Sequence, residues 1–474
     1  MATLALGLLG LALQPRAATA GPLVTGVTNI EEENPVGFAH TAATGARFVR
    51  IPLVWVGIAP YREPASWQPD DPLDSHYDWS QSDAAVAGAV AAGLTPVLQV
   101  DTGPPWVQGC APPSFARART CKLNPDALAA FATAAARRYS GAFPGLPRVR
   151  YWQALNEPNL SLFFNPQFEG DVPVSPYIYR NLLNRFYGAV KSVDPTNLVL
   201  AAGLGPIAVP GFTIGPMRFA RLLLCMQGTK HPQPATGDCE GGAHFDIFAI
   251  QPYTTGGPTH EGRVNDVELG DLTKLQTLIA AADKAGRIHG AYEHTPLWIT
   301  EFSWDSNPPD PGGLPTKIET AWVAEALYRA WRAGVSHFFW YSLRDDAPEP
   351  GRSYAETLES GLYLRGATIE QDQPKEFLAA FRFPFVSYHR KESLFFWGRT
   401  PNSKRGRVAI QLLRGGRWRT AWRTRANGSG IFTGRFGSRY GRARKGLVRA
   451  TYRGQASIPF SMHPVGDFRH SPFG

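Results

Sequence analysis

The sequence predicts an α/β protein in which a (β/α)8 barrel, residues 21–386, is followed by a small all-β sandwich, residues 387–474. Strand-like and helix-like segments alternate eight times along the first domain, as parallel α/β folds require. From Tyr388 onward, short alternating segments separated by glycine turns replace this pattern. The charge changes at the same place, because residues 388–474 have a balance of +17 and the rest of the chain has a balance of −8. At 474 residues, the chain also exceeds what one hydrophobic core usually supports.

The barrel strands are predicted from apolar runs that are rich in branched and aromatic residues and are bounded by Gly, Pro or polar residues. Gly93 and Gly334 end predicted helices in the C′ position, and Asn124-Pro125 begins another, because proline is tolerated in a first helical turn. The predicted strands are residues 24–30, 45–55, 94–100, 149–155, 197–204, 245–253, 296–301 and 337–342. The predicted helices are residues 36–44, 83–92, 124–139, 176–193, 217–226, 272–287, 319–333 and 375–382.

Closure into a barrel is the simplest arrangement of eight such units, because a closed sheet has no exposed edge. The alternative is an open, doubly wound sheet. No Gly-rich phosphate-binding loop follows any predicted strand, which weakens that alternative.

The clearest pattern in the basic domain is a hairpin. Its strands are Arg407–Arg414 and Arg417–Arg423, and Gly415-Gly416 forms the tight turn between them. A linker is expected near Pro384–Lys391. Further strands are predicted at residues 430–436, 447–452 and 456–461, which completes an antiparallel sandwich.

Residues 1–20 fit a secretory signal peptide, with the apolar run Thr3–Leu13 followed by the small residues Ala18-Thr19-Ala20. No Lys or Arg precedes this run, and a buried first element of the domain is the alternative. We therefore expect a secreted or cell-surface protein whose mature chain begins near Gly21. The run is too short to span a bilayer comfortably, and no other transmembrane segment is predicted.

Four cysteines form two close pairs in the sequence, Cys110 with Cys121 and Cys225 with Cys239. Export favours two local disulfides, although four cysteines allow three connectivities. No Cys-x-x-Cys or paired-histidine spacing indicates a metal, so we expect neither a metal nor a cofactor.

Two glutamates stand where predicted strands end. Glu157 follows the fourth strand within Asn156-Glu157-Pro158, and Glu301 closes the seventh strand, 144 residues later. A single glutamate here is more simply a surface residue at a strand terminus. Because the ends of strands four and seven share one rim of a barrel, the pair predicts two carboxylates that act together.

This arrangement resembles the retaining glycoside hydrolases of clan A, of the cellulase-like family 39 and family 5 type, over residues 24–385. The resemblance implies a TIM barrel that needs no cofactor, with Glu157 as acid/base and Glu301 as nucleophile. The sequence departs from many relatives at Leu155, where tryptophan or glycine is common, and in a long third-strand loop bracketed by cysteines.

The resemblance also implies three polar contacts. Asn156 would donate a hydrogen bond to the substrate 2-hydroxyl, Tyr253 would contact the nucleophile, and Arg50 would lie beside it. Each has an ordinary alternative, which is a turn cap for Asn156, packing for Tyr253 and a structural ion pair for Arg50.

Three tryptophans are candidates for contacts with a sugar ring. By the resemblance, Trp340 on strand eight would be the platform on which a pyranose stacks. Trp106 and Trp304, in the loops after strands three and seven, are candidates to line the cleft. Core or loop packing is the alternative for all three.

The sequence thus predicts a secreted retaining glycosidase that acts, as a monomer, on a β-linked oligosaccharide or polysaccharide. The alternative is a non-catalytic carbohydrate-binding or wall-attached protein on the same fold. The basic domain is expected to bind an anionic cell-wall polymer, with a solvated arginine-rich face as the alternative. Export and the lack of a recognition helix or RNA motif argue against nucleic acid.

Overall fold

The computed structural model describes residues 21–28, 30, 34–110, 120–236, 241–348, 351–390, 393–437, 446–462 and 465–473. The predicted signal peptide, residues 1–20, lies outside the described residues. Within the described part of the chain, no helix is long and apolar enough to cross a bilayer.

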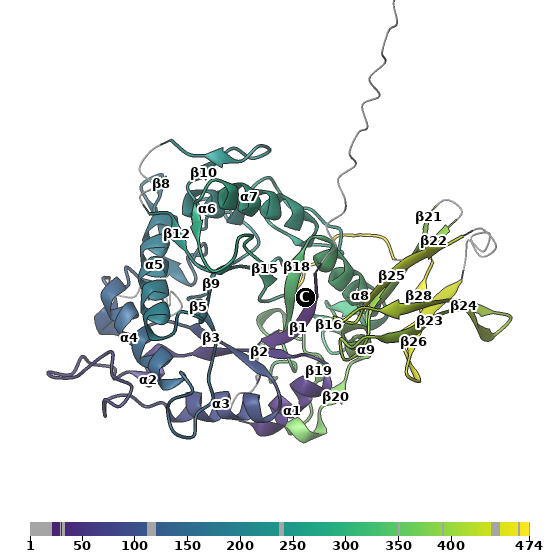
Figure 1. Ribbon diagram of the computed structural model, residues 1–474, viewed down its shortest axis with the longest axis horizontal. Coiled ribbons are helices and arrows are strands. Elements are labelled where there is room, and N and C mark those ends of the chain that lie inside the picture. The colour runs from purple at the N-terminus through teal and green to yellow at the C-terminus, as the bar shows by residue number, and fades with distance from the viewer. Residues whose placement is uncertain are drawn as a thin grey trace, which may run out of the picture.

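Eight parallel strands close into a barrel, which confirms the predicted fold class (Figure 1). Every predicted strand is present, and the order around the barrel is β1-β2-β3-β5-β9-β13-β15-β18, with β18 pairing back to β1. The strands are β1 (Val24–Thr28), β2 (Phe48–Leu53), β3 (Thr95–Val100), β5 (Tyr151–Ala154), β9 (Leu198–Leu204), β13 (Ile247–Ile250), β15 (Leu297–Ile299) and β18 (Val335–Tyr341).

Helices surround the barrel on the outside, as Figure 1 shows. Their starts follow capping rules, since the Asn124 side chain accepts hydrogen bonds from the backbone N–H groups of Asp126 and Ala127. The main helices are α1 (Pro35–Ala43), α3 (Ser80–Ala91), α4 (Pro125–Arg138), α5 (Ser175–Val193), α6 (Pro216–Leu223), α7 (Leu272–Lys284), α8 (Thr316–Arg332) and α9 (Glu376–Arg382). The predicted helices match these within a few residues at each end.

Short elements occupy the loops. They are α2 (Trp55–Ile58), η1 (Pro105–Val107), β4 (Thr120–Cys121), β6 (Phe164–Asn165), β7 (Phe168–Glu169), β8 (Val172–Pro173), β10 (Met226–Gln227), β11 (Gln233–Pro234), β12 (Ala243–His244), η2 (Leu269–Asp271), β14 (Ile288–His289), β16 (Ser306–Asn307), β17 (Leu314–Pro315), η3 (Tyr354–Glu356), β19 (Tyr363–Leu364), η4 (Ile369–Gln371) and β20 (Gln373–Pro374).

The barrel interior is apolar at its lower end and polar above. Phe48 of β2 and Tyr151 of β5 contact each other edge to face, with ring centroids 5.3 Å apart. Because side chains alternate along a strand, the next inward positions are Arg50 and Gln153. The apolar layer therefore supports a polar layer directly beneath the rim.

The C-terminal part forms two antiparallel sheets, as predicted. One has the order β21-β22-β25 and the other β24-β23-β26-β27, with β28 also paired to β26. Trp422 of β24, which is 44% exposed, stacks on Phe436 of β25 with centroids 6.0 Å apart, so the two sheets are in contact through these side chains. The strands are β21 (Phe385–Arg390), β22 (Ser393–Arg399), β23 (Gly406–Arg414), β24 (Arg417–Ala426), β25 (Ile431–Phe436), β26 (Leu447–Tyr452), β27 (Gln455–Ala456) and β28 (Phe460–Ser461).

The stretch near Pro384–Lys391, where a linker is expected, contains β21 over its described residues, and Tyr388 of β21 packs against Tyr328 of α8 at 5.8 Å. Its apolar residues are buried between the sandwich and the barrel, so the chain crosses between the two parts as a strand.

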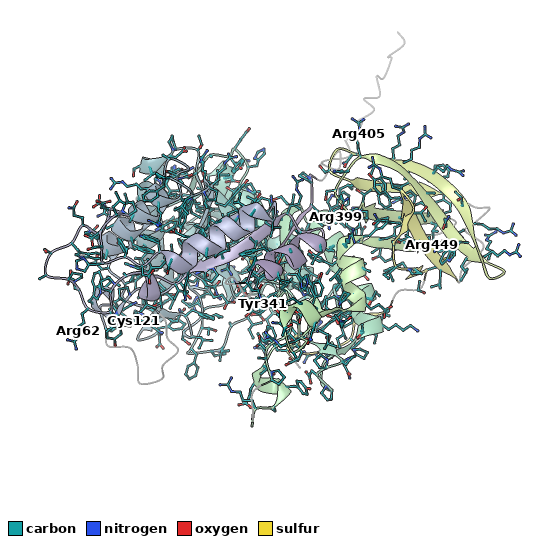
Figure 2. All side chains as sticks on the ribbon, turned by 90° about the horizontal axis from the view of Figure 1, so that it is seen from below. Arg62, Cys121, Tyr341, Arg399, Arg405 and Arg449 are labelled. Carbon is teal, nitrogen blue, oxygen red and sulfur yellow. A yellow bond between two sulfur atoms is a disulfide. The ribbon has the colours of Figure 1, made fainter. Side chains whose placement is uncertain are left out.

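Arg399 ties the sandwich to the barrel, and Figure 2 shows it between the two parts. It is fully buried and donates to the carbonyl oxygens of Leu23 at 3.1 Å and Phe381 at 3.1 Å, and to the Thr25 hydroxyl at 3.2 Å. Burial lowers the pKa of Arg399 to about 10.

One of the two predicted disulfides is described in full. Cys110 and Cys121 are bonded, with Cα atoms 5.7 Å apart, which confirms that pairing. Cys225 is also disulfide-bonded, whereas its expected partner Cys239 lies outside the described residues.

Candidate active site

Glu157 is presented by a tight turn that follows β5. Leu155 and Glu157 both have positive φ, at 61° and 43°, which L-residues rarely adopt outside turns. The Glu157 N–H donates to the carbonyl oxygen of Gly203 at 3.2 Å, so the turn is held against β9. Glu157 is only 8% exposed, which rules out a solvated surface position.

The hydrogen bonds of Asn159 also hold this turn in place. Asn159 is fully buried and donates to the carbonyl oxygens of Gly205 and Ile214, while its own oxygen accepts from the Gly205 N–H at 2.9 Å. A Cβ atom at Gly205 would lie 2.9 Å from the Glu157 Oε1 atom. The loop after β9 therefore packs directly on the Glu157 carboxylate and leaves no space for a side chain at 205.

Arg50 connects both strand ends. Its guanidinium donates to Glu301 at 2.7 Å, to Gln153 at 2.8 Å and to the Asn156 Oδ1 atom at 2.7 Å. The Gln251 side chain donates to the same Asn156 oxygen at 2.8 Å. The structure thus brings Arg50, Asn156 and Glu301 into one network, and Gln153 and Gln251 belong to it although sequence reasoning missed them.

Glu301 has a second donor on its other oxygen, which is the Tyr253 hydroxyl at 3.1 Å. Burial raises the pKa of Tyr253 well above its ordinary value, so the hydroxyl is neutral and donates. Glu301 therefore accepts a charge-assisted hydrogen bond from Arg50 and a neutral one from Tyr253.

The two glutamates differ in their surroundings. Burial and the charge of Glu301 raise the pKa of Glu157 well above its ordinary value. Burial also raises the pKa of Glu301, but Arg50 and Tyr253 act in the opposite direction. Because two negative charges are costly in one buried site, a shared negative charge rests more favourably on Glu301 and a proton on Glu157.

The structure does not place Trp340 in the site. Trp340 is fully buried, its indole N–H donates to the Ser360 carbonyl at 2.7 Å, and its ring packs on Phe377 of α9 at 5.3 Å. Residues alternate along β18, so Trp340 points outward to the helices and Tyr341 points inward. Burial and the charge of Glu301 both raise the pKa of Tyr341.

The other two tryptophans differ in their burial. Trp304 is fully buried, stacks edge to face on Phe302 at 4.7 Å, and donates to the Gly256 carbonyl at 3.1 Å. Trp106 is partly buried, donates to the Pro60 carbonyl at 2.9 Å and contacts Trp67 at 5.4 Å. Trp304 thus has no face available to a ligand, and Trp106 belongs to an aromatic group in the loops after β2 and β3.

The C-terminal segment 465–473 returns from the sandwich to the barrel rim. Asp467 accepts hydrogen bonds from the Gly257 N–H and the Thr259 hydroxyl, both at 2.6 Å. Phe473 is 39% exposed and lies with its ring centroid 4.9 Å from that of Tyr253. This segment was assigned to the accessory domain from the sequence, yet it places an aromatic side chain on a residue that binds Glu301.

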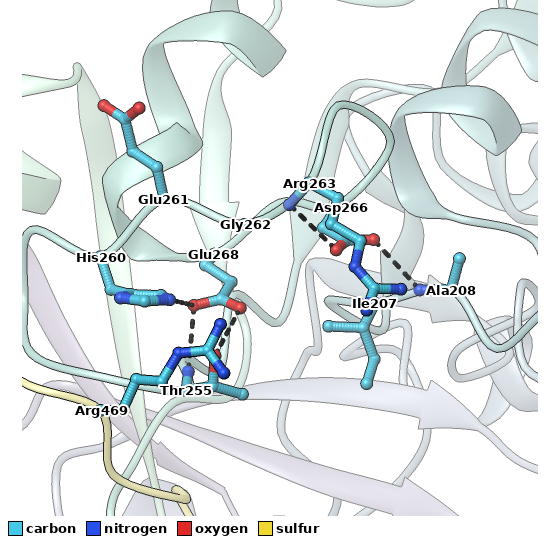
Figure 3. Close-up of a pocket in the computed structure, with 10 residues that line it drawn as sticks. All are labelled: Ile207, Ala208, Thr255, His260, Glu261, Gly262, Arg263, Asp266, Glu268 and Arg469. Atoms are coloured by element: carbon cyan, nitrogen blue, oxygen red, sulfur yellow. Dashed lines mark hydrogen bonds and ion pairs between the residues drawn. The ribbon is translucent and has the colours of Figure 1, made fainter.

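A cavity of about 490 Å³ is lined by residues of the loops after β9 and β13 and by Arg469 of the C-terminal segment (Figure 3). Ile207 and Ala208 line it just beyond Gly205, and Thr255 lines it two residues beyond Tyr253. Neither Glu157 nor Glu301, both within the described residues, is among its lining side chains. The remaining lining residues are His260, Glu261, Gly262, Arg263, Asp266, Glu268 and Arg469.

Glu268 is the centre of the polar wall of this cavity, as Figure 3 shows. It accepts hydrogen bonds from the Thr254 hydroxyl at 2.8 Å and from the backbone and hydroxyl of Thr255 at 3.0 Å. His260 lies 3.7 Å from the same carboxylate. The cavity is therefore lined by charged side chains that the protein itself orients.

The missed residues had a signal in the sequence. Gln153 and Gln251 interrupt otherwise apolar strands at inward positions, where a polar side chain needs a buried partner. The inward orientation of Tyr341 can be assigned from the alternation of side chains along β18, once the register of that strand is known. Phe473 had no such signal, because its position depends on where the chain returns after the sandwich.

The fold defines the class of the chain as a (β/α)8 barrel, an architecture that many unrelated activities share. No protein-family model matches the sequence, and no curated protein matches it. Among solved structures, the chain is similar to a family 39 glycoside hydrolase from the gut symbiont Bacteroides cellulosilyticus WH2, at 16% identity and a TM-score of 0.52, over 87% of this chain and 79% of that one. It is also similar to a GH39 β-xylosidase from Caulobacter crescentus, at 16% identity and a TM-score of 0.51, over 84% of each chain. At this identity the similarity shows a shared fold.

Proposed function

We propose that the protein is a retaining glycoside hydrolase. The observation that carries this proposal is the asymmetric pair of buried carboxylates at the rim, Glu157 and Glu301. One is bound by Arg50 and Tyr253, and the other is held beside it with a raised pKa. The family 39 names of two neighbours with the same fold agree with this chemistry.

In the first step, Glu157 gives its proton to the glycosidic oxygen while the Glu301 carboxylate attacks the anomeric carbon. The C–O bond to the leaving group breaks as the bond to Glu301 forms. In the second step, Glu157 takes a proton from water, whose oxygen displaces Glu301 and releases the sugar with its original configuration. The shared proton on Glu157 is thus in place before substrate arrives.

Asn156 supplies the contact to the sugar ring in this proposal. Its Oδ1 atom is occupied by Arg50 and Gln251, so its amide N–H group is the part oriented for a ligand oxygen. A donor fixed in this way stabilises a 2-hydroxyl in the transition state. The charged cavity formed by the loops after β9 and β13 would then accept further sugar residues of a β-linked oligosaccharide or polysaccharide.

The decisive experiment compares the wild-type protein with Glu301→Gln and Glu157→Gln on a panel of aryl β-glycosides and polysaccharides, with product anomers followed by NMR. We expect the wild-type protein to release product with retained configuration. We expect Glu301→Gln to lose turnover. Glu157→Gln should impair natural glycosides far more than activated aryl glycosides, because a good leaving group needs little protonation.

Glu325→Gln is the matched control, since Glu325 is also buried but pairs with Arg329 on α8, away from the rim. It should keep full turnover. A 2-deoxy-2-fluoro glycosyl fluoride, which slows the second step, should label Glu301 and be found on its peptide by mass spectrometry. Inverted product, or a label on another residue, would refute the retaining mechanism.

A non-catalytic carbohydrate-binding protein on the same fold is the second candidate. Saturable glycan binding with no turnover on any substrate would favour it. The ordered donors around Glu301 argue against it, because binding alone requires no polarised carboxylate pair.

We further propose that the protein acts outside the cell as a monomer, and that its basic sandwich holds it on an anionic cell-wall polymer. On β23 and β24, Arg407 lies opposite Arg425, and Arg423 is the next residue of β24 on that face. All three side chains are exposed. Like charges placed opposite each other are unfavourable, and an anionic ligand would relieve them.

Deleting the sandwich is a poor test, because Arg399 and the segment 465–473 anchor it to the barrel. Replacing Arg407, Arg423 and Arg425 by Gln should instead abolish salt-sensitive retention on isolated cell walls while leaving turnover unchanged. Retention equal to that of the wild type would remove this part of the proposal.

A further inference from the structure

Three buried carboxylates meet between the loops that follow β15 and β18. Asp305 and Asp310 lie in the loop after β15, and Glu359 lies in the loop after β18. Each offers an oxygen, and these oxygens lie within 4.8 Å of one another. Their exposures are 0%, 4% and 3%, so water cannot screen the repulsion between them.

The protein orients these carboxylates but leaves oxygens without a partner. Asp310 accepts from the Gly312 N–H at 2.7 Å and Glu359 accepts from the Thr357 hydroxyl at 2.8 Å, each through one oxygen. The second oxygen of each, and both oxygens of the fully buried Asp305, have no hydrogen-bond partner among the described residues. A buried carboxylate without a partner is costly, and four such oxygens at one point require an explanation.

Lys375 does not neutralise the cluster. Lys375 is buried and donates to Asp345 at 2.5 Å, to the Ser306 hydroxyl at 2.6 Å and to the Glu359 carbonyl at 2.8 Å. Its charge is therefore matched by Asp345. Glu319 is also fully buried, and neither of its oxygens has a partner among the described residues.

Four unpartnered carboxylate oxygens at one buried point, with Lys375 already matched by Asp345, leave the cluster in need of a cation.

We propose that Asp305, Asp310 and Glu359 bind one divalent cation of the Ca²⁺ type. The donor set is oxygen only, and carboxylates from two loops suit the flexible coordination of Ca²⁺ better than the strict octahedron of Mg²⁺. Cysteine and histidine spacing in the sequence does not detect such a site. This proposal departs from the expectation of no metal, which rested on cysteine and histidine spacing alone.

The position of the site gives the cation a structural effect on the rim. The Asp305 N–H donates to the Pro472 carbonyl at 2.7 Å, and the Asp305 carbonyl accepts from the Leu314 N–H at 2.7 Å. Pro472 precedes Phe473, which packs on Tyr253. A bound cation would thus hold together the loops after β15 and β18 and the C-terminal segment at the rim.

The test uses the full chain after treatment with a chelator and dialysis. Isothermal titration with CaCl₂ at pH 8.5, where protons compete least, should show one Ca²⁺ per chain. The melting temperature should rise with Ca²⁺ concentration, by roughly 2–5 °C at saturation. Asp305→Asn should abolish both effects, and it should melt no lower than the wild type in the absence of Ca²⁺, because it removes one of the repelling charges.

Asp372→Asn is the matched control, because Asp372 is also buried but pairs with Arg344 at 2.7 Å. It should lower the melting temperature and keep the Ca²⁺ response. If Asp305→Asn fails to fold, Glu359→Gln provides the same comparison. Absence of binding by Ca²⁺, Mg²⁺ and Mn²⁺ in the folded wild type, or a Ca²⁺ response that survives in Asp305→Asn, would overturn the proposal. Neither measurement uses a glycoside, so a failure here is independent of the proposed activity.

Discussion

Replacing Arg50 separates the two tasks that the structure gives this side chain. The guanidinium places a positive charge 2.7 Å from the Glu301 carboxylate, and its fork also holds Asn156 and Gln153. Arg50→Met removes the charge and the donors while it keeps similar volume. Arg50→Lys keeps the charge but cannot bond all three partners at once.

The expected shift follows from the hydrogen bond that is lost. A buried, charge-assisted hydrogen bond contributes about 1.5–3 kcal/mol, and one pKa unit corresponds to about 1.4 kcal/mol. Arg50→Met should therefore raise the pKa of Glu301 by roughly 1–2 units. The nucleophile must be ionised to attack, so a higher pKa moves the acidic limb of the kcat/KM profile to higher pH. On that limb, activity should fall about 10- to 100-fold.

The assay is the pH dependence of kcat/KM on the best substrate of the panel, because this quantity reports the ionisation of the free enzyme. Arg50→Lys should keep its acidic limb within about half a unit of the wild type, with a lower plateau because Asn156 is no longer held. Circular dichroism and melting curves show whether each variant is folded. A folded Arg50→Met protein whose acidic limb coincides with that of the wild type would refute the assignment of Glu301 as a nucleophile kept ionised by Arg50.

Three further substitutions test other contacts. Tyr253→Phe removes the hydroxyl 3.1 Å from Glu301 and should lower kcat/KM about 2- to 12-fold, the equivalent of one neutral hydrogen bond; an unchanged value would show that the contact has no catalytic effect. Phe473→Ala should raise KM more than it lowers kcat, because the ring lies beside Tyr253 at the rim and not among the reacting groups; steady-state kinetics with unaltered KM would contradict a role in binding. Arg399→Met should lower the free energy of unfolding by about 2–4 kcal/mol, since the buried carbonyl groups of Leu23 and Phe381 lose their donor; a denaturation midpoint equal to that of the wild type would argue against this anchor.

The barrel was predictable because the sequence signals for its strands and helices are local. Each strand is a short apolar run, each helix has its own cap or terminal glycine, and eight repeats of this pattern have one economical closure. Glu157 and Glu301 could be found for the same reason, since a strand end is visible in the sequence and the order of strands places both ends on one rim. Arg50 and Tyr253 followed from the family resemblance.

The sugar platform shows where this reasoning stops. Trp340 and Tyr341 are adjacent, and which of the two faces the barrel interior depends on the register of β18 against β1 and β15. A shift of one residue exchanges the two faces of a strand. The composition of the run does not decide the register, because aromatic residues suit both the interior and the helix-covered face.

The sequence alone determined the eight-stranded barrel, the antiparallel sandwich and the two strand-end carboxylates, because each rests on a pattern within one or two neighbouring segments. Tertiary structure alone decided that Gln153 and Gln251 join the network around Arg50 and Asn156, that Trp340 and Trp304 are buried, and that the segment 465–473 returns to the rim. It also decided that Asp305, Asp310 and Glu359 converge. These features depend on contacts between residues far apart in the chain, where small differences in register and loop path change which side chains meet.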